Sequence, residues 1–365
     1  MFDIVATTKA LLKGCQIPSD MGVTLYTPDG LGNYRALWTR DFYYMVEYAK
    51  DLIDDRDVEA CIQLLVDTAR EDGWIADRVE ETGKAIYTAG DENFPALPNL
   101  DNACFLCLCA DAYLKTIDPA RAKTLFLQWK DTLCRGLDCL PQNEYGLMLN
   151  ETVPLHSPYG FTDTVCKPGV LCFETLLLWS AQKALCRWMD ACGCSCAAYE
   201  ARSCSIEEHF MNTFLHESGM LIACTGKRDK IDLWASCFAV SIGFPMSQAQ
   251  RERISAWMIE NYDSVVSHGQ LRHLPANEYW DETFIPVEKG TYQNGAFWAT
   301  PCVWLFDTLC VKDSVLAESA LDALLSYFEE YGVFECINGE YKKLDTYVAS
   351  AVPTYTLCKR IGKIK

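Results

Sequence analysis

Apolar residues recur at helical spacing, every third or fourth position, through most of the 365-residue chain. Polar residues fill the positions between them, as on helices that bury one face. The pattern predicts twelve helices, at 2–14, 40–54, 57–71, 100–117, 119–136, 169–190, 195–216, 231–242, 247–262, 295–311, 314–331 and 342–360. Local signals support several boundaries, among them Pro119 at a first helical position, Ser247 as a cap, and Gly136 and Gly193 as stops or breaks.

The connections between these helices alternate in length. Short connections follow the even-numbered helices, and long ones follow the odd-numbered helices, at 15–39, 72–99, 137–168, 217–230, 263–294 and 332–341. Two long segments contain hairpin patterns, and Asn338-Gly339 is a strong hairpin-turn signal. Six helical hairpins with their long loops at one end predict an all-α fold, an (α/α)6 toroid with small β-hairpins on one face. A helical solenoid is the alternative, which the absence of a short repeat motif disfavours.

Length and charge narrow the class of protein. No linker-like segment divides the chain, so we expect one domain over residues 1–365. The net charge of −18 argues against nucleic-acid partners and anionic membranes. The first residues lack the basic and apolar regions of a signal peptide, and no apolar run approaches membrane length.

The chain has twenty cysteines, and many lie inside apolar helical segments, as do Cys104, Cys107, Cys109, Cys172 and Cys186. Such cysteines are small buried residues of a reducing compartment, so we expect free thiols and a cytoplasmic location. Cys104-x-x-Cys107 and the 192–196 cluster lack the paired spacing of zinc sites. We therefore expect neither a metal nor a cofactor.

Three short motifs combine aromatic rings with planar polar groups where a loop meets a predicted helix. They are Leu-Trp-Thr-Arg-Asp at 37–41, Tyr-Gly-Phe-Thr-Asp-Thr at 159–164 and Gly-Thr-Tyr-Gln-Asn-Gly-Ala-Phe-Trp at 290–298, which we expect to open the tenth helix. A sugar stacks its C–H face on aromatic rings, and its vicinal hydroxyls bind planar groups in pairs. The motifs therefore indicate a small carbohydrate partner, and residues 40, 101, 163 and 293 are expected on one rim of the toroid.

These motifs resemble those of the six-hairpin glycosidases: trehalases, glucoamylases, processing α-glucosidases and debranching glucosidases. Trp38-Thr-Arg-Asp41 is similar to their Trp-x-Arg-Asp element, Gly160-Phe-Thr-Asp163-Thr to their Gly-Trp-x-Asp-Ser segment, and the 292–298 motif to their Tyr-x-Asn-Gly-x-x-Trp segment. The resemblance implies inverting hydrolysis by two carboxyl groups, with Asp163 as the general acid. Glu288 is the expected general base, and Glu278, Asp281 and Glu282 in the same loop are alternatives.

Further residues near the loop ends are candidates for sugar binding. They are Trp38, Arg40, Asp41, Asp101, Asn102, Lys167, Trp280, Gln293, Asn294 and Trp298. Several of these residues could instead have a structural role. The aspartates can be helix caps, the tryptophans can be core residues and the amides can be turn residues.

The predicted function is an exo-acting glycosidase for a small oligosaccharide or glycoside, since no appended binding module is evident. A sugar epimerase or an unsaturated-uronide hydrolase on the same fold is one alternative. An epimerase commonly uses histidines to move a proton at carbon, and only His268 and His273 lie near the proposed site. A non-catalytic carbohydrate-binding toroid is the other alternative. The sequence specifies neither the sugar and its linkage nor the oligomeric state.

Overall fold

The computed structural model describes residues 2–90 and 94–364. It is mainly helical, and its strands form small antiparallel sheets. Each of the twelve predicted helices has a counterpart, and a short additional helix, α10 (Tyr262–Val265), follows the ninth. No helix in the described part of the chain has the length and apolar character needed to cross a membrane.

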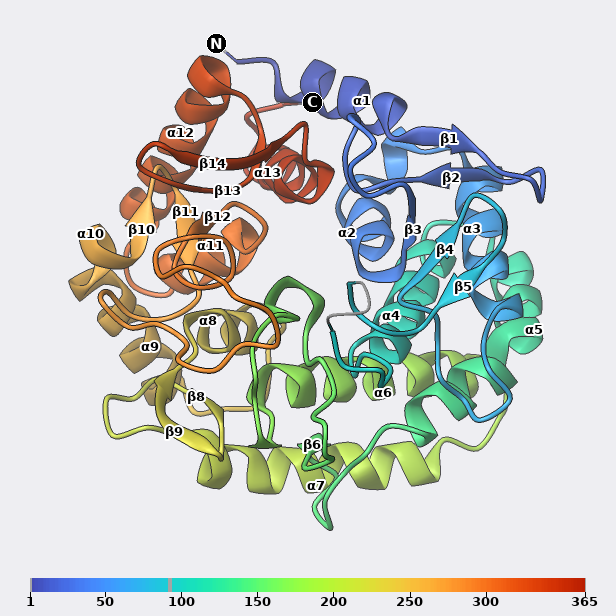
Figure 1. Ribbon diagram of the computed structural model, residues 1–365. Coiled ribbons are helices and arrows are strands. Elements are labelled where there is room, and N and C mark those ends of the chain that lie inside the picture. The colour runs from blue at the N-terminus through green and yellow to red at the C-terminus, as the bar shows by residue number, and fades with distance from the viewer. Residues whose placement is uncertain (1, 91–93, 365) are drawn as a thin grey trace.

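Six helices form a ring in which each contacts the next and the last contacts the first (Figure 1). In ring order they are α2 (Thr39–Ala49), α4 (Asn102–Leu114), α6 (Cys172–Ala191), α8 (Leu233–Ser241), α11 (Cys302–Cys310) and α13 (Val348–Arg360). They are the six even-numbered helices of the predicted series. Helix α4 is buried along its whole length, as expected of a helix that is apolar on every side.

The other helices pack outside this ring. They are α1 (Ile4–Gly14) against α13, α3 (Asp55–Asp67) against α4, α5 (Pro119–Asp138) against α4 and α6, α7 (Ala197–Phe214) against α6, α9 (Gln248–Glu260) against α8 and α11, and α12 (Ser314–Tyr331) against α11. Capping residues begin several of them: Asp118 accepts from two backbone amides at the start of α5, and Ser247 accepts from Gln250 at the start of α9. One hydrophobic core includes side chains from Ile4 to Cys358.

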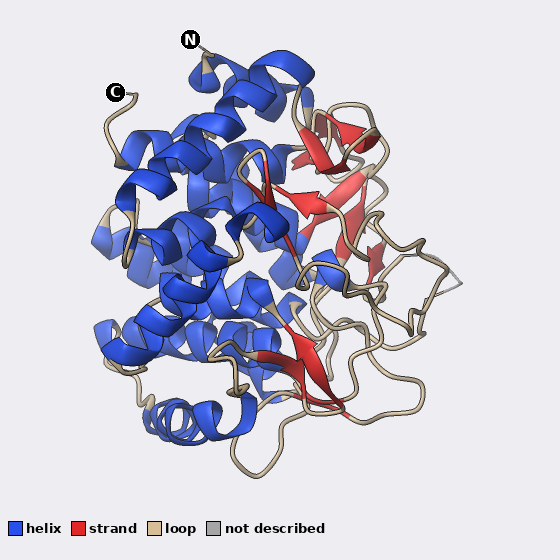
Figure 2. Ribbon diagram, turned by 90° about the vertical axis from the view of Figure 1, so that its left-hand side faces the viewer, coloured by secondary structure: helices blue, strands red, loops and turns tan. Residues whose placement is uncertain are grey.

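The strands and long loops gather at one end of the helices (Figure 2). The strands are β1 (Gln16–Pro18), β2 (Thr24–Tyr26), β3 (Ala36–Trp38), β4 (Arg78–Glu80), β5 (Ala85–Ile86), β6 (Leu149–Asn150), β7 (Gly169–Val170), β8 (Ile222–Cys224), β9 (Lys227–Ile231), β10 (Val266–Ser267), β11 (Gln270–Arg272), β12 (Phe297–Trp298), β13 (Phe334–Asn338) and β14 (Tyr341–Asp345). Both predicted hairpins are confirmed, as β8–β9 and β13–β14. Strands β10 to β14 form one sheet of five in sequence order.

Two predicted helix starts are wrong. Helix α11 begins at Cys302 rather than 295, because Phe297 and Trp298 pair with β11 and with Ile337 of β13. The preceding turn has positive φ at Gly290, Tyr292 and Gly295, a conformation that a right-handed helix cannot contain. The last helix likewise begins at Val348 rather than 342, because 341–345 is the second strand of a hairpin.

Candidate active site

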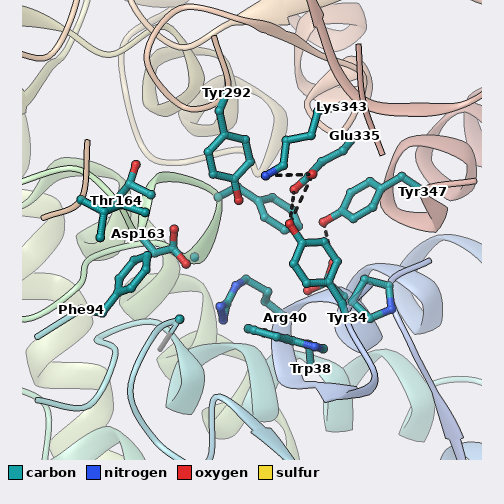
Figure 3. A pocket seen from close by; sticks show the side chains of 16 residues that line it. Tyr34, Trp38, Arg40, Phe94, Asp163, Thr164, Tyr292, Glu335, Lys343 and Tyr347 are labelled. Carbon is teal, nitrogen blue, oxygen red and sulfur yellow. Dashed lines mark hydrogen bonds and ion pairs between the residues drawn. The ribbon is translucent and has the colours of Figure 1, made fainter. Parts of the chain in front are cut away.

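A pocket of about 210 Å³ opens at the end of the helices where the loops gather. This volume lies below the range typical of pockets for drug-sized ligands, and suits one small molecule. The lining comes from six separate parts of the chain: Pro28, Tyr34, Trp38, Arg40, Asp41, Gly90, Phe94, Gly160, Phe161, Asp163, Thr164, Ile285, Tyr292, Glu335, Lys343 and Tyr347. Both aromatic rings and charged groups line it (Figure 3).

Asp163 reaches the pocket from a single 3-10 turn, η2 (Gly160–Thr162). The turn is held by Asp101, whose carboxylate accepts a 2.7 Å hydrogen bond from the Gly160 amide. Gly160 leaves no room for a side chain, because a Cβ there would lie 1.5 Å from Nε of Arg40. The Gly-x-x-Asp spacing therefore brings Asp163 and Arg40 into one site.

Gln293 fixes the orientation of the Asp163 carboxyl. Its amide nitrogen donates to Asp163 Oδ1 at 2.8 Å, and its oxygen accepts from both the backbone amide and the hydroxyl of Thr164. Burial raises the pKa of Asp163 to about 6, although the charge of Arg40 and the Gln293 hydrogen bond both lower it. An acid with this pKa retains a proton closer to neutral pH than an exposed aspartate does.

Three carboxyl groups line the pocket, those of Asp41, Asp163 and Glu335. Glu335, on β13, lies in a position that faces Asp163 (Figure 3). The hydroxyl of Tyr34 donates to it at 3.3 Å, and the Lys343 ammonium lies 3.8 Å away. Burial raises the pKa of Glu335 to about 8, although the charge of Lys343 lowers it. The sequence analysis did not identify Glu335 as a site residue. The pattern that could have identified it is a glutamate inside an otherwise apolar strand, Phe-Glu-Cys-Ile, because a buried carboxyl is rare without a function or a partner.

Arg40 and Asp41 both line the pocket but do not form a pair with each other. Two guanidinium nitrogens of Arg40 donate to Asp77 Oδ1 at 2.6 Å, and Asp41 accepts from the Tyr347 hydroxyl at 2.8 Å. Asp77 also accepts from Asn99 at 3.0 Å. Because all three members of the Arg40–Asp77–Asn99 group are almost fully buried, the guanidinium is held rigidly at the base of the pocket.

Asp101 and Asn102 lie next to the pocket rather than in its lining. Asp101 is fully buried and holds the Gly160 turn, and burial raises its pKa to about 7. The buried amide of Asn102 lies among Arg40, Asp77 and Asp101. The structure thus brings residues 40, 101, 163 and 293 together, as predicted, but gives Asp101 and Asn102 supporting positions.

The structure does not bring the four predicted base candidates into the pocket lining. Glu288 is exposed and lies at the start of a turn. Its backbone oxygen accepts a hydrogen bond from the hydroxyl of Thr291. Asp281 and Glu282 are exposed as well and form ion pairs with lysines. Glu278 is half-buried and its pKa is raised by burial, but it lies outside the pocket.

Four of the predicted binding residues are core or turn residues instead. Lys167 is fully buried, with its ammonium 3.6 Å from Glu174 and 3.8 Å from Asp232. Trp280 donates from its indole to His273, and the Asn294 side chain bonds the Trp280 backbone at 2.7 and 3.1 Å. Trp298 stacks on Phe161 beneath the pocket surface.

Trp38 does line the pocket. The ring of Tyr34 meets it edge-on with 5.6 Å between centroids, and the guanidinium of Arg78 lies over its face at 4.7 Å. Its indole nitrogen has no hydrogen-bond partner in the described protein.

Residues 2–90 and 94–364 contain one group of three side chains arranged closely enough to hold a metal ion, Asp190, Cys196 and Glu200. None of the three lines the pocket. The pocket carboxyls Asp41, Asp163 and Glu335 do not form such a group.

No protein-family model and no curated protein match this sequence. Solved structures do match. The GH63 mannosylglycerate hydrolase from Thermus thermophilus, in complex with Tris and D-glycerate, has a TM-score of 0.71 at 13% identity, covering 97% of this chain and 100% of that chain. A rhamnosidase from Klebsiella oxytoca with rhamnose bound has a TM-score of 0.67 at 15% identity, covering 98% of this chain and 64% of that one.

A GH78 rhamnosidase of Bacillus sp. GL1 has a TM-score of 0.63 at 15% identity, over 98% of this chain and 35% of that chain. At such low identity these likenesses define the fold alone. The chain has the fold of these glycoside hydrolases, and the resemblance drawn from the three motifs is confirmed at that level.

Proposed function

We propose that this protein is an inverting, exo-acting glycoside hydrolase formed by a single (α/α)6-barrel domain over residues 1–365. The observation that carries the proposal is the pair Asp163 and Glu335, two buried carboxyls that enter one small pocket from facing positions. Inverting glycosidases need two such groups, with space between them for a sugar and a water molecule. The shared fold with known glycosidases supports the same conclusion.

Asp163 is the proposed general acid, which donates its proton to the oxygen of the leaving group. Its raised pKa keeps a proton available, and Gln293 holds one carboxyl oxygen so that the other can face the glycosidic bond. Its place in the Gly-Phe-Thr-Asp-Thr motif, which resembles the acid segment of known glycosidases, supports the assignment.

Glu335 takes the place of Glu288 as the proposed general base, which removes a proton from the attacking water. Its position facing the acid supports this role, as do two groups that stabilise its ionised form, the Tyr34 hydroxyl and the Lys343 ammonium. With pKa values of about 6 and about 8, the two carboxyls together hold about one proton near neutral pH, and in the free protein that proton lies mainly on Glu335. The assignment of Asp163 as the acid therefore rests on its motif and on its contact with Gln293 rather than on the pKa values.

The pocket dimensions and lining favour a terminal sugar residue as the substrate. A volume of about 210 Å³ has room for little more than one ring, so cleavage would release a single sugar. Trp38 and Tyr292 offer aromatic faces, and Arg40 and Asp41 offer hydrogen-bonding groups for hydroxyls.

The alternative functions have less support. The lining contains no histidine among the described residues, whereas an epimerase of the kind considered above would use one; His273 instead bonds Asp232 at 2.9 Å in the core. A uronide carboxylate would need a free cation, but Arg40 is neutralised by Asp77 and the Lys343 ammonium lies 3.8 Å from Glu335. A non-catalytic binding protein would gain nothing from two carboxyls whose pKa values are raised by burial.

Hydrolysis of aryl and natural glycosides, with the product anomer followed by NMR, tests the proposal. Substrates should include mannosides, glucosides and rhamnosides, because the matching structures are of enzymes named for mannosylglycerate and rhamnose. The expected result is a product of inverted configuration. A product of retained configuration would overturn the proposed mechanism. A folded protein that hydrolyses none of these glycosides would overturn the proposed function.

Variants assign the roles. Asp163→Asn should slow poor leaving groups by orders of magnitude and activated aryl glycosides much less, because only poor leaving groups need protonation. Glu335→Gln should slow both types alike, whereas the matched control Glu288→Gln should retain wild-type rates. If Glu335→Gln shows the leaving-group dependence instead, the two roles are exchanged.

A further inference from the structure

Asp163 and Gln293 come from two long loops, which both contribute to the pocket lining. We call residues 159–168 the acid loop and residues 273–296 the amide loop. The amide of Phe284 donates to a backbone oxygen of the acid loop at 2.8 Å, and a backbone amide of the acid loop donates to the amide loop at 3.2 Å. Because the proposed acid and the side chain that orients it come from different loops, their 2.8 Å hydrogen bond depends on how the two loops are held together.

A small hydrophobic core, separate from the main one, lies between the two loops. It consists of Val165, Ala223, Leu274 and Trp280, none of which is more than 3% exposed. Val165 belongs to the acid loop, whereas Leu274 and Trp280 belong to the amide loop. Small clusters of this kind commonly lie under long loops. Trp280, which the sequence predicts to bind sugar, therefore packs between the loops instead.

A chain of buried polar groups begins at the same tryptophan. The indole of Trp280 donates to Nδ1 of His273 at 3.3 Å, so in the neutral ring the proton lies on Nε2. Burial lowers the pKa of His273, which favours this neutral ring. Nε2 lies 2.9 Å from Oδ2 of Asp232, and the same oxygen lies 3.8 Å from the ammonium of Lys167 in the acid loop. We call these four residues the inter-loop chain.

The acid loop is anchored at Lys167, whose side chain is fully buried. In the described part of the protein two carboxyls lie near its ammonium: Glu174 of α6 at 3.6 Å and Asp232, which caps α8, at 3.8 Å. A buried ammonium that loses its carboxyl partners is strongly disfavoured. The end of the acid loop is therefore fixed to two helices of the ring.

The other end of the chain reaches the proposed acid through Asn294. The side-chain oxygen of Asn294 accepts from the Trp280 amide at 2.7 Å, and its nitrogen donates to the Trp280 carbonyl at 3.1 Å. The residue before it is Gln293, which donates to Asp163. The contacts thus form a closed ring that begins at Asp163 and ends at Lys167, four residues further along the acid loop.

We propose that the inter-loop chain positions the general acid. It fixes the spacing between the acid loop and the amide loop, and thereby keeps Gln293 in hydrogen-bond contact with Asp163. No member of the chain lines the pocket, so its effect on the reaction is exerted through the Asp163 carboxyl. The inference rests on the role of Asp163 in the proposed function, and it adds residues that support this role from outside the site.

The pKa of Asp163 separates this role from a purely structural one. The charged groups around Asp163 in the described pocket are Arg40, Asp41, Glu335 and Lys343, and Asp77 acts on it as well. None of them belongs to the inter-loop chain, and the Gln293 hydrogen bond lowers this pKa. Loss of the Asp232 charge would by itself lower the pKa of Asp163, whereas a weakened Gln293 hydrogen bond raises it. The sign of the shift therefore identifies the cause.

Asp232→Asn tests the proposal. Asparagine can still accept from the Ala235 amide and cap α8, but its amide nitrogen then faces His273 and Lys167 as a donor among donors. We expect kcat to fall about tenfold with little change in KM, and the limb of the pH–rate profile near pH 6 to move upward by about half a unit. Asp118→Asn, the same change at the cap of α5, is the matched control and should change neither.

Trp280→Phe is a milder second variant, which keeps a ring in the small core and removes the indole donor. It should shift the pKa of Asp163 in the same direction, and it decides the matter if Asp232→Asn does not fold. Trp179→Phe, which loses an indole hydrogen bond to Glu207 outside the pocket lining, is its control. In a Gln293→Ala background neither chain variant should raise the pKa further, because the hydrogen bond through which it acts is already lost.

NMR titration of the Asp163 carboxyl, assigned by comparison with Asp163→Asn, measures the same pKa without turnover. It therefore tests the positioning role even if the protein hydrolyses no glycoside, a result that would overturn the proposed function alone. An unshifted or lowered pKa of Asp163 in the folded chain variants would overturn the inference. A shift that adds fully to that of Gln293→Ala would overturn it as well.

Discussion

Gln293 donates a 2.8 Å hydrogen bond to Asp163 across two loops that are far apart in the sequence. The same amide accepts from the backbone and hydroxyl of Thr164, which fixes which of its ends faces the carboxyl. The neighbouring Asn294 has a different role, because its side chain bonds the backbone of Trp280 and Val287. Of these two adjacent amides, Gln293 therefore orients the proposed acid, whereas Asn294 stabilises the turn.

Substitution of these two amides should therefore have different effects. Gln293→Ala should lower kcat/KM by ten- to a hundredfold and move the Asp163 limb of the pH–rate profile upward, because the lost hydrogen bond stabilises the ionised carboxylate. Asn294→Ala should mainly lower the melting temperature, since it leaves buried backbone groups unsatisfied. An unchanged pH profile in Gln293→Ala would contradict the positioning role.

Activity should depend on pH as a bell-shaped curve. The kcat/KM profile of the free protein should have limbs near pH 6 and pH 8, because burial raises the pKa values of Asp163 and Glu335 to about those values. The two limbs belong to the pair rather than to single residues. A profile that is flat from pH 5 to pH 9 in a steady-state assay would contradict this.

Stability should fall as the pH rises from 6.5 to 8.5. Burial raises the pKa of Asp101 to about 7 and that of Glu335 to about 8, so over this range the folded protein holds protons that the unfolded chain has released. The free energy of unfolding therefore decreases with pH. We expect the melting temperature to drop by about 2–5 °C, measured by scanning calorimetry. Glu335→Gln should show a smaller drop, and Glu288→Gln should behave as wild type.

The order of the helices could be predicted from the sequence, because helical periodicity is a local property of each segment. The place of Asp163 in the pocket could be predicted as well, because it lies in a short motif, Gly160-Phe-Thr-Asp163-Thr, that resembles a segment of known glycosidases. Glu335 could not be found this way. Its burial depends on the β13–β14 hairpin folding over the end of the helix ring beside β12, and that arrangement involves the whole sheet.

The misplaced binding residues have a similar explanation. Lys167 and Trp280 belong to the right loops, but a loop residue can face the pocket or the core, and the sequence pattern of an irregular segment does not show which. Lys167 faces Glu174 and Asp232, two carboxyls that sequence reasoning did not associate with it. Glu288 lies in the same loop as Trp280 but is exposed.

The cysteines provide a test of compartment and packing. All twenty are free, and Cys204 and Cys310 are the exposed ones. Titration of the unfolded protein with a thiol reagent, without reductant, should therefore report about twenty thiols. In the folded protein Cys204 and Cys310 should react first, and the buried thiols should react at the rate of unfolding. Far fewer than twenty thiols in the unfolded chain would contradict the prediction.

The Arg40–Asp77 pair offers a final test, because it links the stability of the fold to the pocket. Asp77→Asn removes the negative charge that balances Arg40 at 2.6 Å in an almost fully buried site. Breaking such a pair costs about 3–5 kcal/mol, so urea denaturation at pH 7 should show a loss of this order. The double variant Arg40→Leu/Asp77→Leu should recover part of the stability, since no buried charge is then left alone. It should not recover activity, because Arg40 lines the pocket. If the Asp77→Asn protein is as stable as wild type, solvent must reach the pair. If the double variant is active, Arg40 does not belong to the proposed site.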